Sequence, residues 1–321
     1  MRLVVTGGAG FIGSHVVDRL LGDGHEVAVV DDLSTGRRDN VNAAARLHVV
    51  DVRAPELRRI IDGTRPAAVV HLAAQAAVSR SVADPAFDAS VNILGTLNLL
   101  DACGAARVRD VVYISTGGAA YGDTDVIPTS ETHLTVPASP YGVSKVAAEL
   151  YLHCWAALAG ARGVSLRLAN VYGPRQNPEG EAGVVAIFTS RLLGGRSCIV
   201  NGDGEQTRDY VYVADVADAV TRALARSAAT GPINVGTARQ TTVNELYRML
   251  AGAAGIERAA EHGQARPGEQ RHSALDWSRA RRLLEWTPAT PLERGLAETV
   301  AWARADRRAT DTRGEATEVP G

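Results

Sequence analysis

A tyrosine and a lysine stand four residues apart in Tyr141-Gly142-Val143-Ser144-Lys145, and on a helix this spacing places both on one face. A nearby ammonium favours phenolate over phenol, so we expect Lys145 to lower the pKa of Tyr141 from about 10 towards working pH. Such a tyrosine can act as a general base. The spacing alone is also typical of a solvated helix face. The catalytic interpretation is favoured by two hydroxyl residues that end an apolar run, Ser115 and Thr116, and by a glycine cluster.

That glycine cluster lies between an apolar run and a helical pattern, in Val4-Val5-Thr6-Gly7-Gly8-Ala9-Gly10-Phe11-Ile12-Gly13. The segment fits GxGxxG, and Gly7, Gly10 and Gly13 also fit GxxGxxG. Glycines permit a tight turn and let the backbone approach a pyrophosphate, whose charge is met by free amides and the dipole at the helix start. The segment therefore predicts a dinucleotide-binding turn.

A carboxylate follows this turn at the end of the next apolar run, where Val27-Ala28-Val29-Val30 leads to Asp31. A separation of about 20 residues is that of the acid that accepts hydrogen bonds from the adenosine ribose. Its charge would repel a 2'-phosphate, so NAD is favoured over NADP. Asp51 and Val52 follow a third run and are placed to meet the adenine edge, although an aspartate often simply caps a strand. The alternative to a cofactor site is a structural glycine turn with a solvent-exposed aspartate.

These residues must be positioned by a doubly wound α/β fold, because short apolar runs alternate with helical segments. Continuous β-branched runs of this length are typical of a parallel sheet buried on both faces. The predicted strands cover residues 3–5, 26–30, 47–50, 67–71, 111–115 and 164–168. Helices are expected after Gly10 and from Pro140 onward. The fold class is therefore a Rossmann-like parallel sheet with a smaller C-terminal lobe.

The length of 321 residues is about twice that of a typical domain, which predicts one large domain and a smaller lobe. From about residue 173 the pattern changes to a loop rich in Gly, Pro, Asn and Glu, followed by short mixed elements. We expect an NAD-binding domain at 1–173, to which later segments return, and a substrate-binding lobe mainly at 174–304. A final amphipathic helix is predicted at 291–304, and a flexible polar tail at 305–321.

Composition excludes several classes of partner. With 34 basic and 36 acidic residues, the net charge of -2 offers no global field for nucleic acid or an anionic membrane. No window approaches the roughly 20 consecutive apolar residues of a membrane-spanning helix, and the first apolar run begins too early to leave room for a leader peptide. Cys103, Cys154 and Cys198 have no CxxC spacing and the histidines no ligand spacing, so no disulfide or metal site is predicted. A soluble, cytoplasmic protein is expected.

The order and spacing of further motifs resemble the extended short-chain dehydrogenase family, which includes the NAD-dependent epimerases and dehydratases. These motifs are the glycine turn, His71-Leu72-Ala73-Ala74, Ser115-Thr116, Tyr141 with Lys145, and Arg208-Asp209-Tyr210-Val211. The resemblance covers residues 1 to about 304. Within the family the chain is most similar to bacterial UDP-glucose (UDP-galactose) 4-epimerases, through Asn170-Val171-Tyr172-Gly173-Pro174-Arg175-Gln176 and residues 180–188.

The resemblance implies a transient oxidation of a UDP-hexose. Tyr141, aided by Thr116 or Ser115, removes the proton of the sugar 4-hydroxyl while a hydride passes from C4 to the nicotinamide of NAD. The resulting 4-keto sugar turns and takes the hydride back on its opposite face, so NAD is regenerated and stays bound. Lys145 also holds the nicotinamide ribose. The family further implies a homodimer joined through helices near residues 95–103 and 141–155.

The resemblance also implies binding residues at matching positions. For the cofactor they are Gly7, Gly10, Phe11, Ile12, Gly13, Asp31, Asp32, Asp51, Val52, Leu72, Ala73, Ala74, Asn92, Ser115, Tyr141 and Lys145. For the nucleotide sugar they are Thr116, Gly117, Tyr141, Asn170, Val184, Val185, Asn201, Arg208, Arg266, Glu269 and Ser273. Arg208 and Arg266 are expected to meet the diphosphate, because a guanidinium can donate two hydrogen bonds at once to a phosphate.

Several positions depart from the family pattern. Gly117 stands where many epimerases have their catalytic serine, which makes Thr116 the nearest hydroxyl. Gly117 and Gly118 also replace the Asp-Glu pair of sugar 4,6-dehydratases, so dehydration is disfavoured. Asn201 replaces an aromatic residue that often stacks on uracil, which leaves the base open. Ser273 is small where strict epimerases carry a large tyrosine, so we expect N-acetylhexosamines to be tolerated.

Other functions stay open at this stage. An enzyme that begins with the same C4 oxidation could be a UDP-glucuronate 4-epimerase, a decarboxylase or a dehydratase, with Arg80 or Arg175 meeting a C6 carboxylate. A non-catalytic NAD-binding sensor or scaffold is the alternative from a different class. The presence of Tyr141, Lys145 and the two hydroxyl residues favours an enzyme.

Overall fold

A parallel sheet forms the centre of the computed structural model, which describes residues 1–179, 183–265 and 270–317. In these residues the sheet has seven strands in the order β11-β6-β5-β4-β1-β2-β3. The strands are β1 (Arg2–Thr6), β2 (Glu26–Asp31), β3 (Arg46–Val49), β4 (Ala68–His71), β5 (Asp110–Thr116), β6 (Arg162–Leu168) and β11 (Gly231–Val235). The chain order reverses at β1, which lies between β2 and β4, so the carboxyl end of β1 is the topological switch point of a Rossmann-type sheet. The predicted fold class is confirmed.

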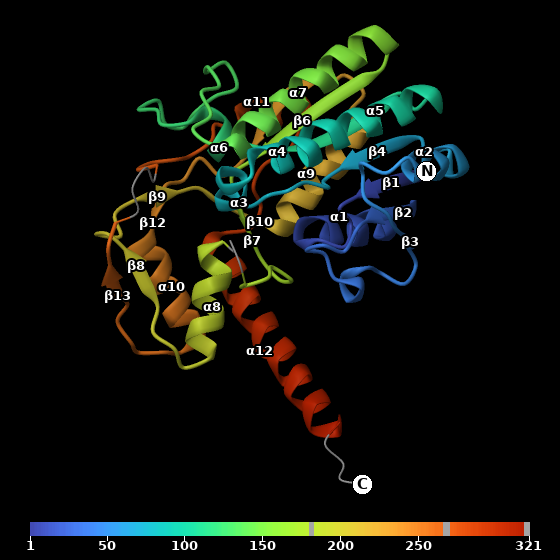
Figure 1. The fold of residues 1–321 in the computed structure, drawn as a ribbon. Helices are drawn as coiled ribbons and strands as arrows, with labels where there is room; N and C mark the ends of the chain where they lie inside the picture. Colours follow the sequence, from blue (N-terminus) through green and yellow to red (C-terminus); the bar gives the residue numbers. More distant parts are fainter. Residues whose placement is uncertain (180–182, 266–269, 318–321) are drawn as a thin grey trace.

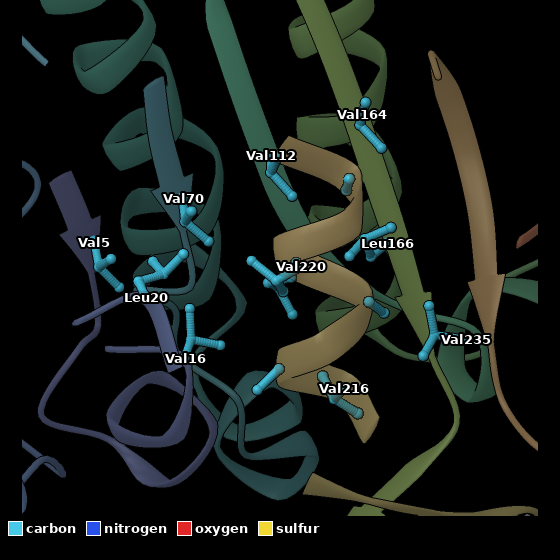
Figure 2. Packing of buried hydrophobic residues seen from close by; sticks show 14 of the residues in the cluster. Val5, Val16, Leu20, Val70, Val112, Val164, Leu166, Val216, Val220 and Val235 are labelled. Atoms are coloured by element: carbon cyan, nitrogen blue, oxygen red, sulfur yellow. The ribbon is translucent and has the colours of Figure 1, made fainter. Parts of the chain in front are cut away.

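Helices cover both faces of this sheet (Figure 1). One face carries α1 (Phe11–Gly22), α9 (Val213–Ala225) and α11 (Ser278–Leu284), whose apolar side chains form one core with the strands. The opposite face carries α2 (Glu56–Thr64), α5 (Gly95–Ala105) and α7 (Pro140–Ala159). Figure 2 shows Val16 and Leu20 of α1 and Val220 of α9 among the inward-facing valines of the strands. Because side chains alternate along each strand, the sheet contributes apolar residues to a core on each of its two faces.

Most predicted strands coincide with observed ones, but β3 does not have the predicted burial. Strands buried on both faces were expected throughout, whereas Val49 in β3 is 49% exposed. The reason is its place in the sheet, because β3 is an edge strand that pairs only with β2 in the described chain. Helix α1 begins directly after Gly10 and α7 begins at Pro140, as the sequence predicts.

Short elements surround the carboxyl ends of the central strands. They are η1 (Arg38–Asn40), α3 (Val78–Ala83), α4 (Pro85–Ala89), the π-helical turn η2 (Ser90–Leu94) and α6 (Gly118–Tyr121). Asp84 caps α4, since its Oδ1 accepts a hydrogen bond from the Phe87 amide at 2.9 Å. Helices α3, α4 and η2 all pack against α7, which brings the segment after β4 beside the helix that carries Tyr141 and Lys145.

The C-terminal lobe has its own apolar core. It contains α8 (Val184–Leu193), α10 (Val243–Ala254), α12 (Leu292–Thr317) and the strand pairs of β7 (Asn170–Tyr172) with β10 (Tyr210–Tyr212), β9 (Thr207–Arg208) with β12 (Thr241–Thr242), and β8 (Ile199–Asn201) with β13 (Glu261–Gly263). Phe188, Leu246 and Leu296 meet between its helices. Between the lobe segments, α9 and β11 return to the main sheet.

Helix α12 is longer than predicted. The sequence placed its end at residue 304 and a flexible tail at 305–321, whereas the helix continues to Thr317 and points away from the sheet (Figure 1). The expectation failed because residues 305–313 lack apolar periodicity but contain no Pro or Gly, so helix propensity alone is sufficient there. Residues 318–321 lie outside the described chain. Within the described ranges, no helix has the length and apolar character needed to cross a membrane.

Candidate active site

The predicted dinucleotide turn joins β1 to α1 at the switch point of the sheet. Gly7 has φ +72°, and a Cβ built there would lie 2.6 Å from the Ala73 amide nitrogen. A Cβ at Gly13 would lie 2.0 Å from the Gly7 carbonyl oxygen. Neither position accepts a side chain, so the glycines are required for the close approach of the turn, α1 and the chain after β4.

The same turn fits a dinucleotide. Gly10 is the N-cap of α1, and within the described chain no side chain caps this helix start, so its first amides are available to an anion. Asp31 lies beside the turn with its Oδ2 accepting from the Ala9 amide and its Oδ1 from the Leu33 amide, both at 2.9 Å. Burial, opposed by these hydrogen bonds, raises the pKa of Asp31. A cradle of amides with an adjacent carboxylate is the pattern that holds a pyrophosphate and a ribose.

Three residues predicted to line the adenine side have partners of their own. The exposed Asp32 accepts hydrogen bonds from the Ser34 amide and hydroxyl. Asp51 is paired with Arg53, 2.5 Å away, and hydrogen bonds from this guanidinium lower the pKa of Asp51. The Val52 side chain is buried and contacts the position of Gly95. Asp51 and Val52 follow β3 at the carboxyl edge of the sheet, and their contact with the adenine stays a prediction.

The predicted catalytic pair lies in the first turns of α7. This helix begins with Pro140 at its first position, and the Ser139 hydroxyl accepts a hydrogen bond from the Gly142 amide at 3.2 Å. Lys145 is 2% exposed, and its Nζ lies 4.3 Å from the centroid of the Tyr113 ring. It is also the only lysine in the whole sequence. The buried site therefore contains a unique ammonium group.

Thr116, at the end of β5, is the hydroxyl residue that the structure brings to Tyr141. Its side chain forms a hydrogen bond with the Tyr141 phenol, and its Oγ1 also accepts from the Ala119 amide at 3.2 Å. The neighbouring Ser115 Oγ is buried and has no hydrogen-bond partner among the described residues. Because successive strand residues face opposite sides of a sheet, the two hydroxyls cannot both reach the phenol.

The protonation of the pair differs from the sequence-based expectation. Burial and the charge of Asp88 raise the pKa of Tyr141 to about 12, and the hydrogen bond with Thr116 opposes this shift. Burial lowers the pKa of Lys145 to about 7, against the raising effect of Glu149 and Asp88. The expected net lowering of the Tyr141 pKa is therefore wrong for the described protein, because burial and Asp88 outweigh any effect of Lys145. The reason is that the face of α7 with Lys145 is buried and Tyr141 on the same face is partly buried, rather than both being solvated.

A buried polar cluster behind the pair was missed by sequence reasoning. Asn92, predicted to contact the cofactor, uses its side-chain amide on protein groups instead. Its Oδ1 accepts from the Gln75 amide at 2.8 Å, and its Nδ2 donates to the Gln75 carbonyl at 2.9 Å, to Ser144 Oγ at 3.0 Å and to Asp88 Oδ1 at 3.2 Å. The spacing of Asp88 and Asn92, four residues apart, was the one available signal of a shared helical face.

Residues 271–275 lie between the catalytic turn and the strand of Arg208, a predicted substrate-binding residue. Arg208, in β9, donates from its guanidinium to the Thr207 carbonyl at 2.8 Å. Thr207 in turn bonds this segment, through its amide to the Arg271 carbonyl at 2.9 Å and through its hydroxyl to His272 Nδ1 at 3.0 Å. Thr207 thus ties the strand of Arg208 to the segment that contains Ser273. Ser273 itself is almost completely buried.

Leu275 connects this segment to the catalytic turn and accounts for Gly117. A Cβ built on Gly117 would lie 2.4 Å from Leu275 Cδ1, so the leucine occupies the space of a side chain at that position. A serine there, as in many epimerases, would require Leu275 to move. The glycine at position 117 is thus accompanied by Leu275, whose side chain takes up the space that a serine would need.

The remaining predicted contacts are more dispersed. Asn170 is exposed at the start of β7, directly after β6, and Asn201 ends β8 in the lobe. Val184 starts α8, but the Val185 side chain is buried in the core of the lobe and leaves only its backbone for a ligand. Arg266 and Glu269 lie outside the described residues.

Arg175, considered above as a contact for a C6 carboxylate, already has a protein partner. The guanidinium of Arg175 is bound to Asp18, 2.5 Å away, so it is already engaged by a protein carboxylate. Among the described residues, no group of three or more His, Cys, Asp or Glu could hold a metal ion. His71 is buried between Thr6, at 2.6 Å from its Nδ1, and Thr96, at 3.0 Å from its Nε2.

Comparison with known proteins gives one consistent group. Residues 3–236 match the NAD dependent epimerase/dehydratase family. A UDP-glucose 4-epimerase of Mycolicibacterium smegmatis is 47% identical over 312 residues, which are 95% of this chain and 99% of the relative.

Two solved structures are similarly close. The UDP-glucose 4-epimerase of Thermotoga maritima with UDP-glucose is 46% identical, with a TM-score of 0.93 over 96% of this chain and 100% of that one. The UDP-glucose 4-epimerase of Thermus thermophilus in complex with NAD is 45% identical, with a TM-score of 0.89 over 95% and 99%. With a matched family over most of its length and such relatives, this chain belongs to the NAD dependent epimerase/dehydratase family.

Proposed function

We propose that the protein is an NAD-dependent UDP-glucose 4-epimerase that interconverts UDP-glucose and UDP-galactose through a 4-keto sugar. The observation that carries this proposal is the contact of Tyr141 with Thr116, next to Lys145 and opposite the glycine turn at the same edge of the sheet. The activity of the relatives and the UDP-glucose and NAD in their structures support the same reaction.

In this reaction the chain supplies a base that must also return a proton. NAD, held by the glycine turn and Asp31, would supply the acceptor and donor of the C4 hydride and, in its oxidised form, positive charge beside the tyrosine. Tyr141 takes the proton of the 4-hydroxyl and gives it back, while the Thr116 hydroxyl stabilises the phenolate by hydrogen bonding. The Lys145 ammonium holds the cofactor ribose and favours the phenolate. The raised pKa of Tyr141 means that these positive charges are needed before it can act as a base.

The two parts of the chain bind different ligands. Residues 1–173, with α9 and β11, bind NAD through the turn of Gly7, Gly10 and Gly13 and through Asp31. The lobe binds the nucleotide sugar, with Arg208 at the diphosphate and Ser273 near the sugar, where its small size leaves room for an N-acetyl group. By resemblance alone, Arg266 is a second contact for the diphosphate and Glu269 a further contact for the nucleotide sugar.

The active form is a cytoplasmic homodimer. Helix α7 presents an unusually apolar outer face, with Val143, Leu150, Tyr151 and Leu158 all exposed, and Leu94 is exposed at the start of neighbouring α5. An apolar stripe of this kind on a soluble protein marks a contact surface. A second copy would cover it by packing the same helices together, which gives an interface with twofold symmetry.

The test is to incubate the purified protein with UDP-glucose and to follow the anomeric protons by NMR. We expect UDP-galactose to form, and Tyr141→Phe to slow its formation at least about 100-fold. Tyr151→Phe is the matched control and keeps the rate, since it removes only a hydroxyl and leaves an apolar ring on the dimer face of the same helix. Parallel samples contain UDP-GlcNAc and UDP-glucuronic acid. Product from UDP-glucuronic acid but none from UDP-glucose would replace the proposal with a glucuronate enzyme, and NAD binding without any product would reject it.

A further inference from the structure

Asp88 is a buried carboxylate that the proposed reaction does not yet use. It lies on α4 and is 1% exposed. Its Oδ1 accepts from Gln75 Nε2 at 2.8 Å and from Asn92 Nδ2 at 3.2 Å. Its Oδ2 is buried and has no hydrogen-bond partner in the described part of the chain. Both donors are neutral amides, so nothing in this cluster cancels the negative charge.

The cluster holds this charge against the catalytic helix. Helix α4 packs on α7, and the Asn92 amide that donates to Asp88 also donates to Ser144 Oγ at 3.0 Å. Ser144 directly precedes Lys145, whose ammonium is buried above the Tyr113 ring. Gln75 also fixes the Asp88 carboxylate, because its Nε2 donates to the Ala77 carbonyl as well as to Asp88, both at 2.8 Å. Asp88 therefore cannot turn away from α7 without breaking several buried hydrogen bonds.

Other charged and titratable groups around this point are engaged elsewhere. Glu149, one turn after Lys145, is bound by Arg167, with Oε2 2.6 Å from NH2. The guanidinium groups of Arg53 and Arg80 lie over the Phe87 ring, on the exposed side of α4. Burial lowers the pKa of His71 to about 3, so this imidazole is neutral. The pKa of the buried Tyr113 is raised well above its usual value, so it is neutral too.

Asp88 acts on both members of the catalytic pair. After burial, its charge is the next cause of the raised pKa of Tyr141. For Lys145, burial lowers the pKa, and the charges of Glu149 and then Asp88 raise it again. A carboxylate near an ammonium and a phenol favours the protonated form of both.

We propose that Asp88 is a positioning residue for the acid/base step: its uncompensated charge favours the protonated forms of Lys145 and Tyr141 until the ligands add positive charge. Without it, desolvation would leave Lys145 largely neutral and unable to support the phenolate. The effect on catalysis rests on the proposed function, whereas the effect on Lys145 is a property of the folded chain alone.

The unique lysine makes a direct test possible. Protein labelled with [13C]lysine gives one lysine Cε signal, because Lys145 is the only lysine, and its shift reports the charge of the ammonium as pH changes. We expect a midpoint of about 7 for the unsubstituted protein. In Asp88→Asn the midpoint should fall by about one pH unit, the lower end of the usual effect of a charge at contact distance. Asp84→Asn is the matched control, since it removes an exposed carboxylate from the same helix start and keeps a capping residue.

An unchanged midpoint in folded Asp88→Asn would overturn the proposal, and so would an equal shift in Asp84→Asn. If Asp88→Asn does not fold, Asp88→Ser, which leaves room for a water, must show the same downward shift. The pH profile of epimerisation gives the second readout. Both its acidic and basic limbs should move to lower pH in Asp88→Asn, whereas a merely structural defect lowers the rate without moving either limb.

The two proposals fail separately. A shifted lysine midpoint in a protein without epimerase activity retains the inference about Asp88 and rejects the proposed function. Epimerase activity with an unshifted midpoint retains the function and rejects the inference.

Discussion

Two buried carboxylates lie beside Lys145, and they are held in opposite ways. Two nitrogens of the Arg167 guanidinium donate to the Glu149 carboxylate, with Nε at 3.0 Å from Oε1 and NH2 at 2.6 Å from Oε2. Arg167 also donates to the Tyr121 hydroxyl at 3.0 Å, which donates to Asn234 at 2.8 Å. This charged chain runs from α7 across β6 to β11. Asp88, on the other side, is held by neutral amides only.

The difference lies in which members of the catalytic pair each charge reaches. Glu149 is paired with Arg167 within the fold; it raises the pKa of Lys145, whereas the raised pKa of Tyr141 comes from burial and Asp88. The charge of Asp88 is not balanced by a protein cation in ion-pair contact within the described ranges, and it acts on Tyr141 as well as on Lys145. Glu149 thus fixes packing through Arg167 and acts on Lys145, whereas the unpaired Asp88 acts on both members of the catalytic pair.

The largest expected effect on stability comes from removing the charge of Glu149 while Arg167 stays in place. Glu149→Gln leaves Arg167 buried without a counter-charge, so we expect the free energy of unfolding to fall by about 3–5 kcal/mol, measured by urea denaturation. Asp88→Asn removes an anion without orphaning an arginine, and its loss should stay within about 1 kcal/mol.

The control for this pair is the double variant Glu149→Leu with Arg167→Met, which removes both charges and should recover most of the loss. Equal losses for Glu149→Gln and Asp88→Asn would show that the two carboxylates have the same role.

A smaller effect on stability concerns His71, which hydrogen bonds through Thr96 and Asn92 join to the Asp88 cluster. The Thr96 hydroxyl donates to the Asn92 carbonyl at 2.6 Å, so His71 Nε2 must donate to Thr96. The folded pKa of His71 is lowered to about 3, so below its unfolded pKa of about 6.5 the unfolded chain binds a proton that the folded chain does not. Stability is therefore lost as pH falls from about 6.5 towards 3, by about 1.4 kcal/mol at pH 5.5.

His71→Gln removes this contribution. The unfolding free energy should fall by about 1.4 kcal/mol less between pH 7.5 and 5.5 in His71→Gln than in the unsubstituted protein, as measured by urea denaturation at both pH values. His262→Gln, at an exposed position, is the control. An identical pH dependence in both variants would mean that His71 takes up its proton within the fold.

Local spacing was sufficient to predict part of the site. The turn of Gly7, Gly10 and Gly13, the acid at Asp31 and the tyrosine with its lysine follow from residues close together in the chain. The structure places the glycines, Asp31, Tyr141 and Lys145 along the carboxyl edge of the predicted sheet.

What could not be predicted depends on contacts between distant residues. The pKa of Tyr141 is set by the burial of α7 and by Asp88, a residue of another helix. The space beside Gly117 is filled by Leu275, from the far end of the chain. Asn92 was assigned to the cofactor by resemblance, and its partners Gln75 and Ser144 become neighbours only in the fold.

The central claim, a hydride that leaves C4 and returns to it, is tested most directly with UDP-glucose deuterated at C4. The purified protein is incubated with this substrate in ordinary water, and the UDP-galactose formed is analysed by NMR and mass spectrometry. Transfer to NAD and back predicts that the product keeps its deuterium at C4. Replacement of that deuterium by a solvent proton would contradict the account, because it would mean that the C4 hydrogen leaves as a proton.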